Sequence, residues 1–205
     1  MQPFTTLSAV VVPLPMANVD TDQIIPARFM RKSRAEGYGD YLLRDVRFDG
    51  QGQPRVGIAL DDAAYAGAQI MVAGRNFGGG SSREAAVYAL VDFGLRCVIA
   101  PSFGDIFTNN AVKNGLLPAR VDDEAARRLI AAAETQPGRS ITVDLPSQTI
   151  DLDGQKLPFD VLPNLKTQLT EGRDDIDLTL RHRQEIADWV AFDRTRRPWA
   201  LPNSQ

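Results

Sequence analysis

Residues 74–86, GRNFGGGSSREAA, contain four glycines, two serines, two arginines and a glutamate. An apolar run at 68–73 precedes this segment, and a run with helical spacing at 85–90 follows it. The order predicts a strand, a glycine-rich turn and a helix. Backbone N–H groups at a helix start lack intrahelical partners, and the helix dipole there favours negative charge. Because glycines also let a ligand approach the backbone closely, the turn is a candidate anion site.

Two interpretations of this turn stay open from the residues alone. Ser81 followed by Glu84 three positions later fits a capping box, in which each side chain satisfies the other residue's backbone N–H. That interpretation leaves Arg83 and the three consecutive glycines unexplained. An anion site explains them, and a carboxylate suits it as well as a phosphate. Its members would be Gly78, Gly79, Gly80, Ser81, Ser82 and Arg83.

Three familiar glycine-rich motifs do not match. A P-loop ends in Gly-Lys-Ser/Thr, and no lysine stands in the segment. The dinucleotide-binding spacing from Gly78 and the nucleophile-elbow spacing around Ser81 both require glycine at position 83, which is Arg83. The single histidine, His182, lies far along the chain among charged residues, which argues against a Ser-His-Asp hydrolase.

The composition excludes further classes of protein. A net charge of −3 over 205 residues argues against a general nucleic-acid binder. One cysteine, Cys97, rules out an internal disulfide or a self-contained iron–sulfur cluster, and its apolar surroundings predict a core thiol. Because neither a signal peptide nor an apolar run of about 20 residues is visible, we expect a cytoplasmic protein without a membrane segment.

Strand and helix patterns alternate through the middle of the chain, which predicts an α/β fold. We expect a mixed, mostly parallel sheet flanked by helices, with an antiparallel addition after residue 138. We also expect one domain over residues 1–205, with a loose tail at 196–205. The expected strands are 8–13, 68–73, 96–100, 116–121, 140–144 and 149–152, and the expected helices are 82–93, 103–113, 122–134, 162–170 and 175–194.

Four segments carry a family resemblance. NFGGGSSRE at 76–84 resembles the motif of the swivelling domain of the aconitase superfamily. NVDTDQIIP at 18–26, VIAPSFGDIFTNNAVKNGLLP at 98–118 and DIDLTLRH at 175–182 are similar to segments of the 3-isopropylmalate dehydratase small subunits. Their order and spacing agree over almost the whole chain.

The resemblance implies a swivelling β/β/α fold and a partner, a large subunit that carries a 4Fe–4S cluster on cysteines of its own. It implies a hydro-lyase of leucine biosynthesis that is active only with that subunit. The substrate would be a small dicarboxylic acid, dehydrated from a 2-alkylmalate to an alkene and rehydrated at the neighbouring carbon. The iron would act as a Lewis acid on the leaving hydroxyl.

The resemblance also assigns residue roles. Ser81 would act as the base in its alkoxide form, which requires positive charge and N–H dipoles around it. Asp22 matches an acidic position near the active serine, whereas Asp20 is expected only to cap its turn. Arg28 is a candidate carboxylate clamp, with a solvated loop arginine as the open alternative. The predicted catalytic residues are thus Ser81, Arg83 and Asp22, and the predicted substrate-binding residues are Gly80, Ser82 and Arg28.

Three positions depart from the family pattern: Arg75, Gly79 and Ala85. Arg75 adds a positive charge beside the turn, and Ala85 stands where the small subunits usually have histidine. These departures keep two alternatives open, a related hydro-lyase of the dimethylmalate or homoaconitate class and a non-catalytic anion-binding module. By family analogy the polar loop Arg31–Tyr41 would cover the alkyl end of the substrate.

Overall fold

The computed structural model describes residues 1–173 and 175–200. The chain divides into two compact units, Met1–Gly172 and Arg173–Gln205, and each is described by itself. A single domain over residues 1–205 stays a prediction. Within the predicted loose tail at 196–205, Pro198–Ala200 form a short 3-10 turn, and residues 201–205 lie outside the described residues.

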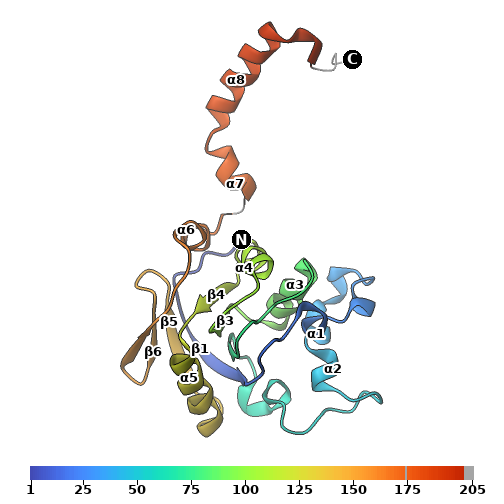
Figure 1. Cartoon of the computed structure of the whole chain (residues 1–205), viewed down its shortest axis with the longest axis vertical. Helices are drawn as coiled ribbons and strands as arrows, with labels where there is room; N and C mark the ends of the chain where they lie inside the picture. The colour runs from blue at the N-terminus through green and yellow to red at the C-terminus, as the bar shows by residue number, and fades with distance from the viewer. Residues whose placement is uncertain (174, 201–205) are drawn as a thin grey trace. The chain divides into compact units, whose positions relative to one another are not determined.

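The first unit is built on one mixed sheet. Its parallel half consists of β1 (Thr6–Leu14), β2 (Ile70–Ala73), β3 (Cys97–Ala100) and β4 (Leu117–Arg120). Its antiparallel half adds β5 (Ser140–Asp144), β6 (Thr149–Leu152) and β7 (Gln155–Pro158). The strand order is β4-β3-β2-β1-β5-β6-β7 (Figure 1).

The two halves of the sheet meet at β1. Val12 of β1 lies opposite Met71 in the parallel register, whereas Leu7 lies opposite Val143 in the antiparallel one. The α/β class and the mixed sheet are confirmed. The prediction of a mostly parallel sheet was wrong, because three of the six strand pairings among the described residues are antiparallel.

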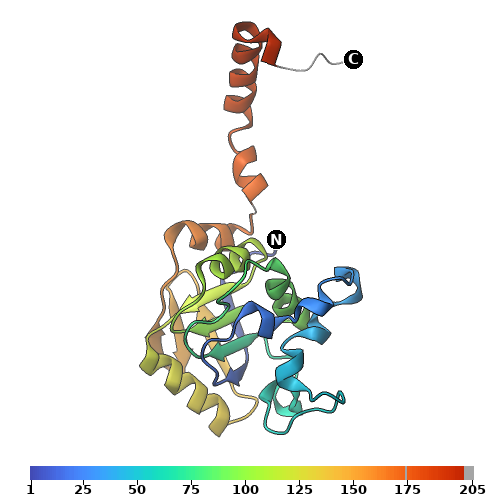
Figure 2. The same ribbon diagram turned by 45° about the vertical axis from the view of Figure 1, so that its right-hand side comes forward.

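Helices cover both faces of the sheet, as Figure 2 shows for the green and olive helices. They are α3 (Glu84–Phe93), α4 (Asp105–Lys113), α5 (Asp123–Thr135) and α6 (Pro163–Glu171). Successive residues of β2 point to opposite faces. Met71 packs in the core cluster that contains α3 residues, whereas Val72 packs in the cluster that contains α5 and α6 residues. The apolar residues Ile70–Ala73 therefore form a strand that is buried on both faces.

The long connection from β1 to β2 contains short helices that the sequence did not predict. They are α1 (Thr21–Ile24), α2 (Arg44–Arg47) and five 3-10 turns: η1 (Ala27–Phe29), η2 (Arg34–Glu36), η3 (Tyr38–Tyr41), η4 (Ala59–Asp61) and η5 (Ala63–Tyr65). The loop 31–41 is anchored on α3, since Arg34 pairs with Asp92. A Cβ on Gly39 would lie 2.7 Å from the Asp92 backbone, so this contact requires glycine.

The second unit contains α7 (Asp175–Leu180) and α8 (Arg183–Arg196), where the sequence predicted one helix over 175–194. The break falls at Arg181 and His182, and His182 occupies the N-cap position of α8 without a side-chain capping bond. Several large apolar side chains are exposed on this unit: Ile176, Leu180, Ile186, Trp189, Phe192 and Trp199. Across the described ranges, no helix has both the length and the apolar character to cross a membrane.

Candidate functional site

The turn after β2 lies beside the turn after β1. The Gly78 N–H donates to the Val19 carbonyl at 2.7 Å, and the Thr21 N–H donates to the Gly79 carbonyl at 3.0 Å. The two turns thus run as a paired ribbon beyond the carboxyl ends of two adjacent parallel strands. Open α/β sheets bind their ligands at such an edge.

Two glycines of the turn are required for different reasons. Gly78 has φ +71°, and a Cβ there would lie 2.3 Å from Cγ of Phe107. Gly80 has φ +91°, but an added Cβ would meet only ordinary contacts, the nearest at 3.6 Å from Cβ of Asp20. Gly78 is therefore fixed by both packing and backbone conformation, whereas Gly80 is fixed by its conformation alone.

Ser81 and Ser82 are exposed and precede the first turn of α3. The capping-box interpretation was wrong, because Arg83 is the N-cap of α3 and makes no side-chain capping bond. Glu84 is the first residue of the helix rather than the third, and its carboxylate accepts from Nδ2 of Asn114 at 3.0 Å. The start of α3 is left without a side-chain cap beside the Ser81 hydroxyl.

Arg83 turns back to α1 and forms an ion pair with Asp22. The Arg83 side chain is 18% exposed and the Asp22 side chain 55% exposed, so the pair borders the open side of the turn. Asp20 caps α1 in a capping box with Gln23, as the sequence predicted. The structure therefore pairs Asp22 with Arg83, two residues after Ser81, at a helix start that has no side-chain cap.

Known proteins resemble this chain over most of its length. The family model described as the aconitase C-terminal domain matches residues 1–124, and a model named LeuD_N matches residues 127–163. A 3-isopropylmalate dehydratase small subunit from Rhodospirillum centenum is 48% identical over 98% of this chain and 100% of that protein. One from Rhodopseudomonas palustris is 46% identical with the same coverage.

The chain belongs to the 3-isopropylmalate dehydratase small-subunit family. A crystal structure titled 3-isopropylmalate dehydratase, from Methanocaldococcus jannaschii, covers 89% of this chain and 98% of that chain. Its TM-score is 0.63 at 24% sequence identity, so this likeness shows a shared fold. The predicted family and the fold that it implied are confirmed.

Arg28, the predicted carboxylate clamp, is held by another residue. Its Nη1 donates to Oδ2 of Asp45 at 2.8 Å, its Nη2 donates to Oδ1, and the guanidinium lies over the Phe29 ring. This hydrogen-bonded contact lowers the pKa of Asp45. To bind a substrate carboxylate, the Arg28 guanidinium would have to break its hydrogen bonds with Asp45. Its role as a carboxylate clamp therefore stays a prediction.

The three positions that depart from the family pattern each contact neighbouring residues of the first unit. Arg75 points to α5, where its Nε donates to Oδ1 of Asp123 at 2.5 Å and its Nη2 to Oδ2. Its charge is thereby paired with a carboxylate whose pKa it lowers. Ala85 is half-buried and packs against the core cluster below α3. A Cβ on Gly79 would lie 3.2 Å from Oδ1 of Asn76, a tight contact.

Sequence reasoning missed Thr21, which lies between the two aspartates of the DTD segment. Its side chain is 2% exposed, and Oγ1 donates to the Ser81 carbonyl at 2.9 Å. In the sequence, only the acidic groups of that segment suggest a functional role. No local signal marks Thr21, because its sequence neighbours Asp20, Asp22 and Gln23 are polar and its burial follows from the pairing of two distant turns.

The implied iron–sulfur cluster does not fit the donors of this chain. Cys97 is fully buried in β3, as predicted, and burial raises the pKa of its thiol, which disfavours the thiolate form that binds metals. His182 is exposed, and its Nδ1 contacts the Glu185 carboxylate at 3.1 Å. Among the residues that the structure describes, no three His, Cys, Asp or Glu side chains gather at a possible metal site.

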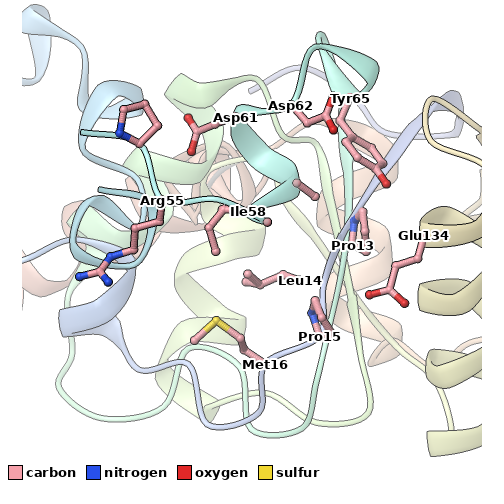
Figure 3. Close-up of a pocket in the computed structure, with 13 residues that line it drawn as sticks. Pro13, Leu14, Pro15, Met16, Arg55, Ile58, Asp61, Asp62, Tyr65 and Glu134 are labelled. Atoms are coloured by element: carbon pink, nitrogen blue, oxygen red, sulfur yellow. The ribbon is translucent and has the colours of Figure 1, made fainter. Parts of the chain in front are cut away.

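A separate pocket of about 520 Å³ lies at the end of β1 (Figure 3). Arg55 and Glu134 stand on opposite sides of an apolar floor that includes Leu14 and Met16. None of the predicted site residues lines it. Met16, which lines the pocket, also contacts the glycine-rich segment, since its carbonyl accepts from the Gly74 N–H at 3.0 Å.

Proposed function

We propose that this chain is the small subunit of a 3-isopropylmalate dehydratase. Together with a large subunit, it would isomerise 2-isopropylmalate to 3-isopropylmalate by dehydration and rehydration in leucine biosynthesis. The observation that carries the proposal is the exposed Ser81 at the uncapped start of α3, beside the Arg83–Asp22 pair. Family membership over nearly the whole chain supports the choice of reaction.

Ser81 would serve as the base for the carbon acid. Within the described residues its hydroxyl has no hydrogen-bond partner, so Oγ is free to accept a proton from a C–H group beside a carboxylate. A serine hydroxyl is a poor base in water and needs preorganised donors to act as an alkoxide. Arg83 and the backbone N–H groups of the turn are the groups that would stabilise its negative charge.

The overall reaction is an isomerisation, because the water that dehydration releases is balanced by the water that rehydration adds. The proton leaves one carbon while hydroxide leaves its neighbour, which gives the alkene diacid. Rehydration then returns the hydroxyl to the carbon that lost the proton and a proton to the other carbon. Ser81 would carry that proton in both half-reactions, and the N–H groups of Gly80 and Ser82 would bind a substrate carboxylate.

The partner would complete the site. Because the thiol of this chain is buried and no metal-binding cluster of side chains is formed by the described residues, the 4Fe–4S cluster would be held by the large subunit. We expect the isolated chain to be inactive for this reason. We also propose that the assembled enzyme is cytoplasmic.

An assay of the assembled protein tests the function. The chain is co-expressed anaerobically with the large subunit from the same source, and alkene formation is followed by ultraviolet absorbance. The panel is 2- and 3-isopropylmalate, dimethylmalate, citramalate and homocitrate. Preference for the isopropylmalates supports the proposal. Preference for another diacid would mean that the chain serves a related hydro-lyase with that substrate. No turnover by a cluster-loaded complex would favour a non-catalytic anion-binding module.

Ser81→Ala tests the base assignment in the same complex. We expect turnover to be lost while assembly is retained, since Ser81 is exposed and caps no helix. Ser140→Ala, at an exposed position at the start of β5, is the matched control and keeps its activity. Wild-type turnover in Ser81→Ala would remove the serine from the mechanism.

A further inference from the structure

Thr21 is a buried polar residue at the centre of the paired turns. It is 2% exposed, the lowest value among the polar and charged side chains that are buried in the described part of the chain. It begins α1, and its carbonyl accepts from the Ile25 N–H at 3.1 Å. Such a side chain is fixed in position by its surroundings, so its hydroxyl has a defined direction.

Thr21 bonds to the glycine turn on both sides of Gly80. Its N–H donates to the Gly79 carbonyl at 3.0 Å, and its Oγ1 donates to the Ser81 carbonyl at 2.9 Å. Gly80 lies between these acceptors with φ +91°, a conformation in which glycine loses much freedom. The two bonds therefore hold the backbone on either side of Gly80, the residue directly before Ser81.

No regular structure holds Ser81 otherwise. Helix α3 begins only at Glu84, so Ser81 lies outside its hydrogen-bond ladder. The other tether between α1 and this segment is the Arg83–Asp22 pair, whose carboxylate side is 55% exposed. An ion pair between long side chains, one of them exposed, holds the backbone less firmly than a hydrogen bond from a short, buried hydroxyl does. The position of the Ser81 backbone thus depends chiefly on Thr21.

We propose that Thr21 is a positioning residue for Ser81, which sets where the serine Oγ stands relative to the substrate. The inference rests on the proposed function, in which Ser81 is the base. Thr21 itself does not touch the reacting atoms, so its removal should lower the rate of the chemical step and leave substrate binding nearly unchanged. A base displaced by about 1 Å can lose about 100-fold in rate.

Thr21→Val and Thr21→Ser separate the hydroxyl from the shape of the side chain. In the complex with the large subunit, Thr21→Val is expected to lower kcat about tenfold or more with KM within about twofold. Thr21→Ser keeps the donor and should restore most of kcat. Thr167→Val is the matched control, because Thr167 also donates to a backbone carbonyl, that of Pro163, in helix α6.

A second measurement does not depend on activity or on the partner. The carbonyl of Ser81 in the full chain is labelled with ¹³C, and its NMR shift is compared among the variants. Loss of the hydrogen bond in Thr21→Val, and in Thr21→Ala should Thr21→Val not fold, is expected to move this resonance. Thr21→Ser should leave it near the wild-type position.

The outcomes distinguish the two proposals. Wild-type kcat in Thr21→Val, a loss confined to KM, or equal losses in Thr21→Val and Thr21→Ser would each overturn the positioning role. An active Ser81→Ala complex would instead overturn the base assignment, whatever Thr21 does. A Ser81 carbonyl that does not respond to Thr21→Val would contradict the hydrogen bond on which the inference stands.

Discussion

Arg83 and Asp22 form an ion pair across 61 positions of the sequence. The contact joins α1 to the N-cap of α3, so two residues that the sequence predicted as catalytic are positioned by each other. The Asp22 carboxylate thereby holds the Arg83 guanidinium against α1, beside the paired turns. The acid is best understood as the group that holds Arg83 in place next to Ser81.

Asp22→Asn should therefore weaken catalysis more than it weakens folding. The neutral amide no longer fixes the guanidinium, and we expect kcat/KM of the complex to fall about ten- to a hundredfold. The free energy of unfolding should change by less than about 1 kcal/mol, because the Asp22 side chain is 55% exposed and Asp20 still caps α1. Steady-state kinetics and urea denaturation measure the two effects.

Asp160→Asn is the control for that substitution. Asp160 pairs with Arg120 in an exposed contact at the edge strand β4, and its loss should leave both quantities near wild type. An Asp22→Asn complex with the kcat/KM of wild type would show that Arg83 needs no partner.

Gly78→Ala should destabilise the first unit. An Ala Cβ would lie 2.3 Å from Cγ of Phe107, and the residue would have to keep φ +71°. We expect a loss of about 3 kcal/mol from overpacking and backbone strain together. Gly50→Ala, where an added Cβ meets nothing within 4 Å, should change the free energy of unfolding by no more than about 0.5 kcal/mol. Equal urea midpoints for the two variants would contradict this account.

The regular elements were predictable because their signals are local. The apolar run at 68–73 and the helical spacing at 85–90 each depend on neighbouring residues, and both elements form within two residues of the expected bounds. Asp153-Gly154 is likewise a local hairpin signal, and both residues have positive φ in the turn between β6 and β7. The glycine turn followed from its own residues, whereas a place for Asp22 near Ser81 was implied only by the family resemblance.

The remaining features depend on contacts that no local pattern encodes. Ser81 and Glu84 match a capping box, yet the Ser81 carbonyl bonds to Thr21, Arg83 has an extended backbone and α3 starts only at Glu84. Arg28 and Arg75 have long side chains, and which acid each one meets is set by where α2 and α5 lie. The sequence identifies these charged groups but not their partners, because the partners come from distant segments.

Arg75→Gln tests whether that departure from the family pattern affects specificity. In the structure the Arg75 guanidinium is bonded to Asp123 at the first turn of α5. We therefore expect the ranking of the diacid panel to stay unchanged in the complex. The pair is exposed, so stability should change by less than about 1 kcal/mol. A new substrate preference in Arg75→Gln would show that this charge acts on the site after all.

Cys97 should be unreactive in the folded chain and should make stability pH-dependent. Burial raises the pKa of its thiol, so the folded state keeps the proton at pH values where the unfolded chain, with a pKa of about 8.5, releases it. Both states are protonated well below that pH, and the stabilisation is complete there. As pH rises above it, the unfolded state is favoured by up to about 1.4 kcal/mol per pH unit.

Urea denaturation of wild type and Cys97→Ala under reducing conditions between pH 7 and 9.5 measures this contribution. The wild-type free energy of unfolding should fall more steeply above pH 8.5 than that of Cys97→Ala, because only wild type has a thiol that ionises on unfolding. Iodoacetamide should label Cys97 in urea but not in the native chain, since the side chain is fully buried in β3. Parallel pH profiles, or rapid labelling of the native chain, would mean that β3 opens enough for water to reach the thiol.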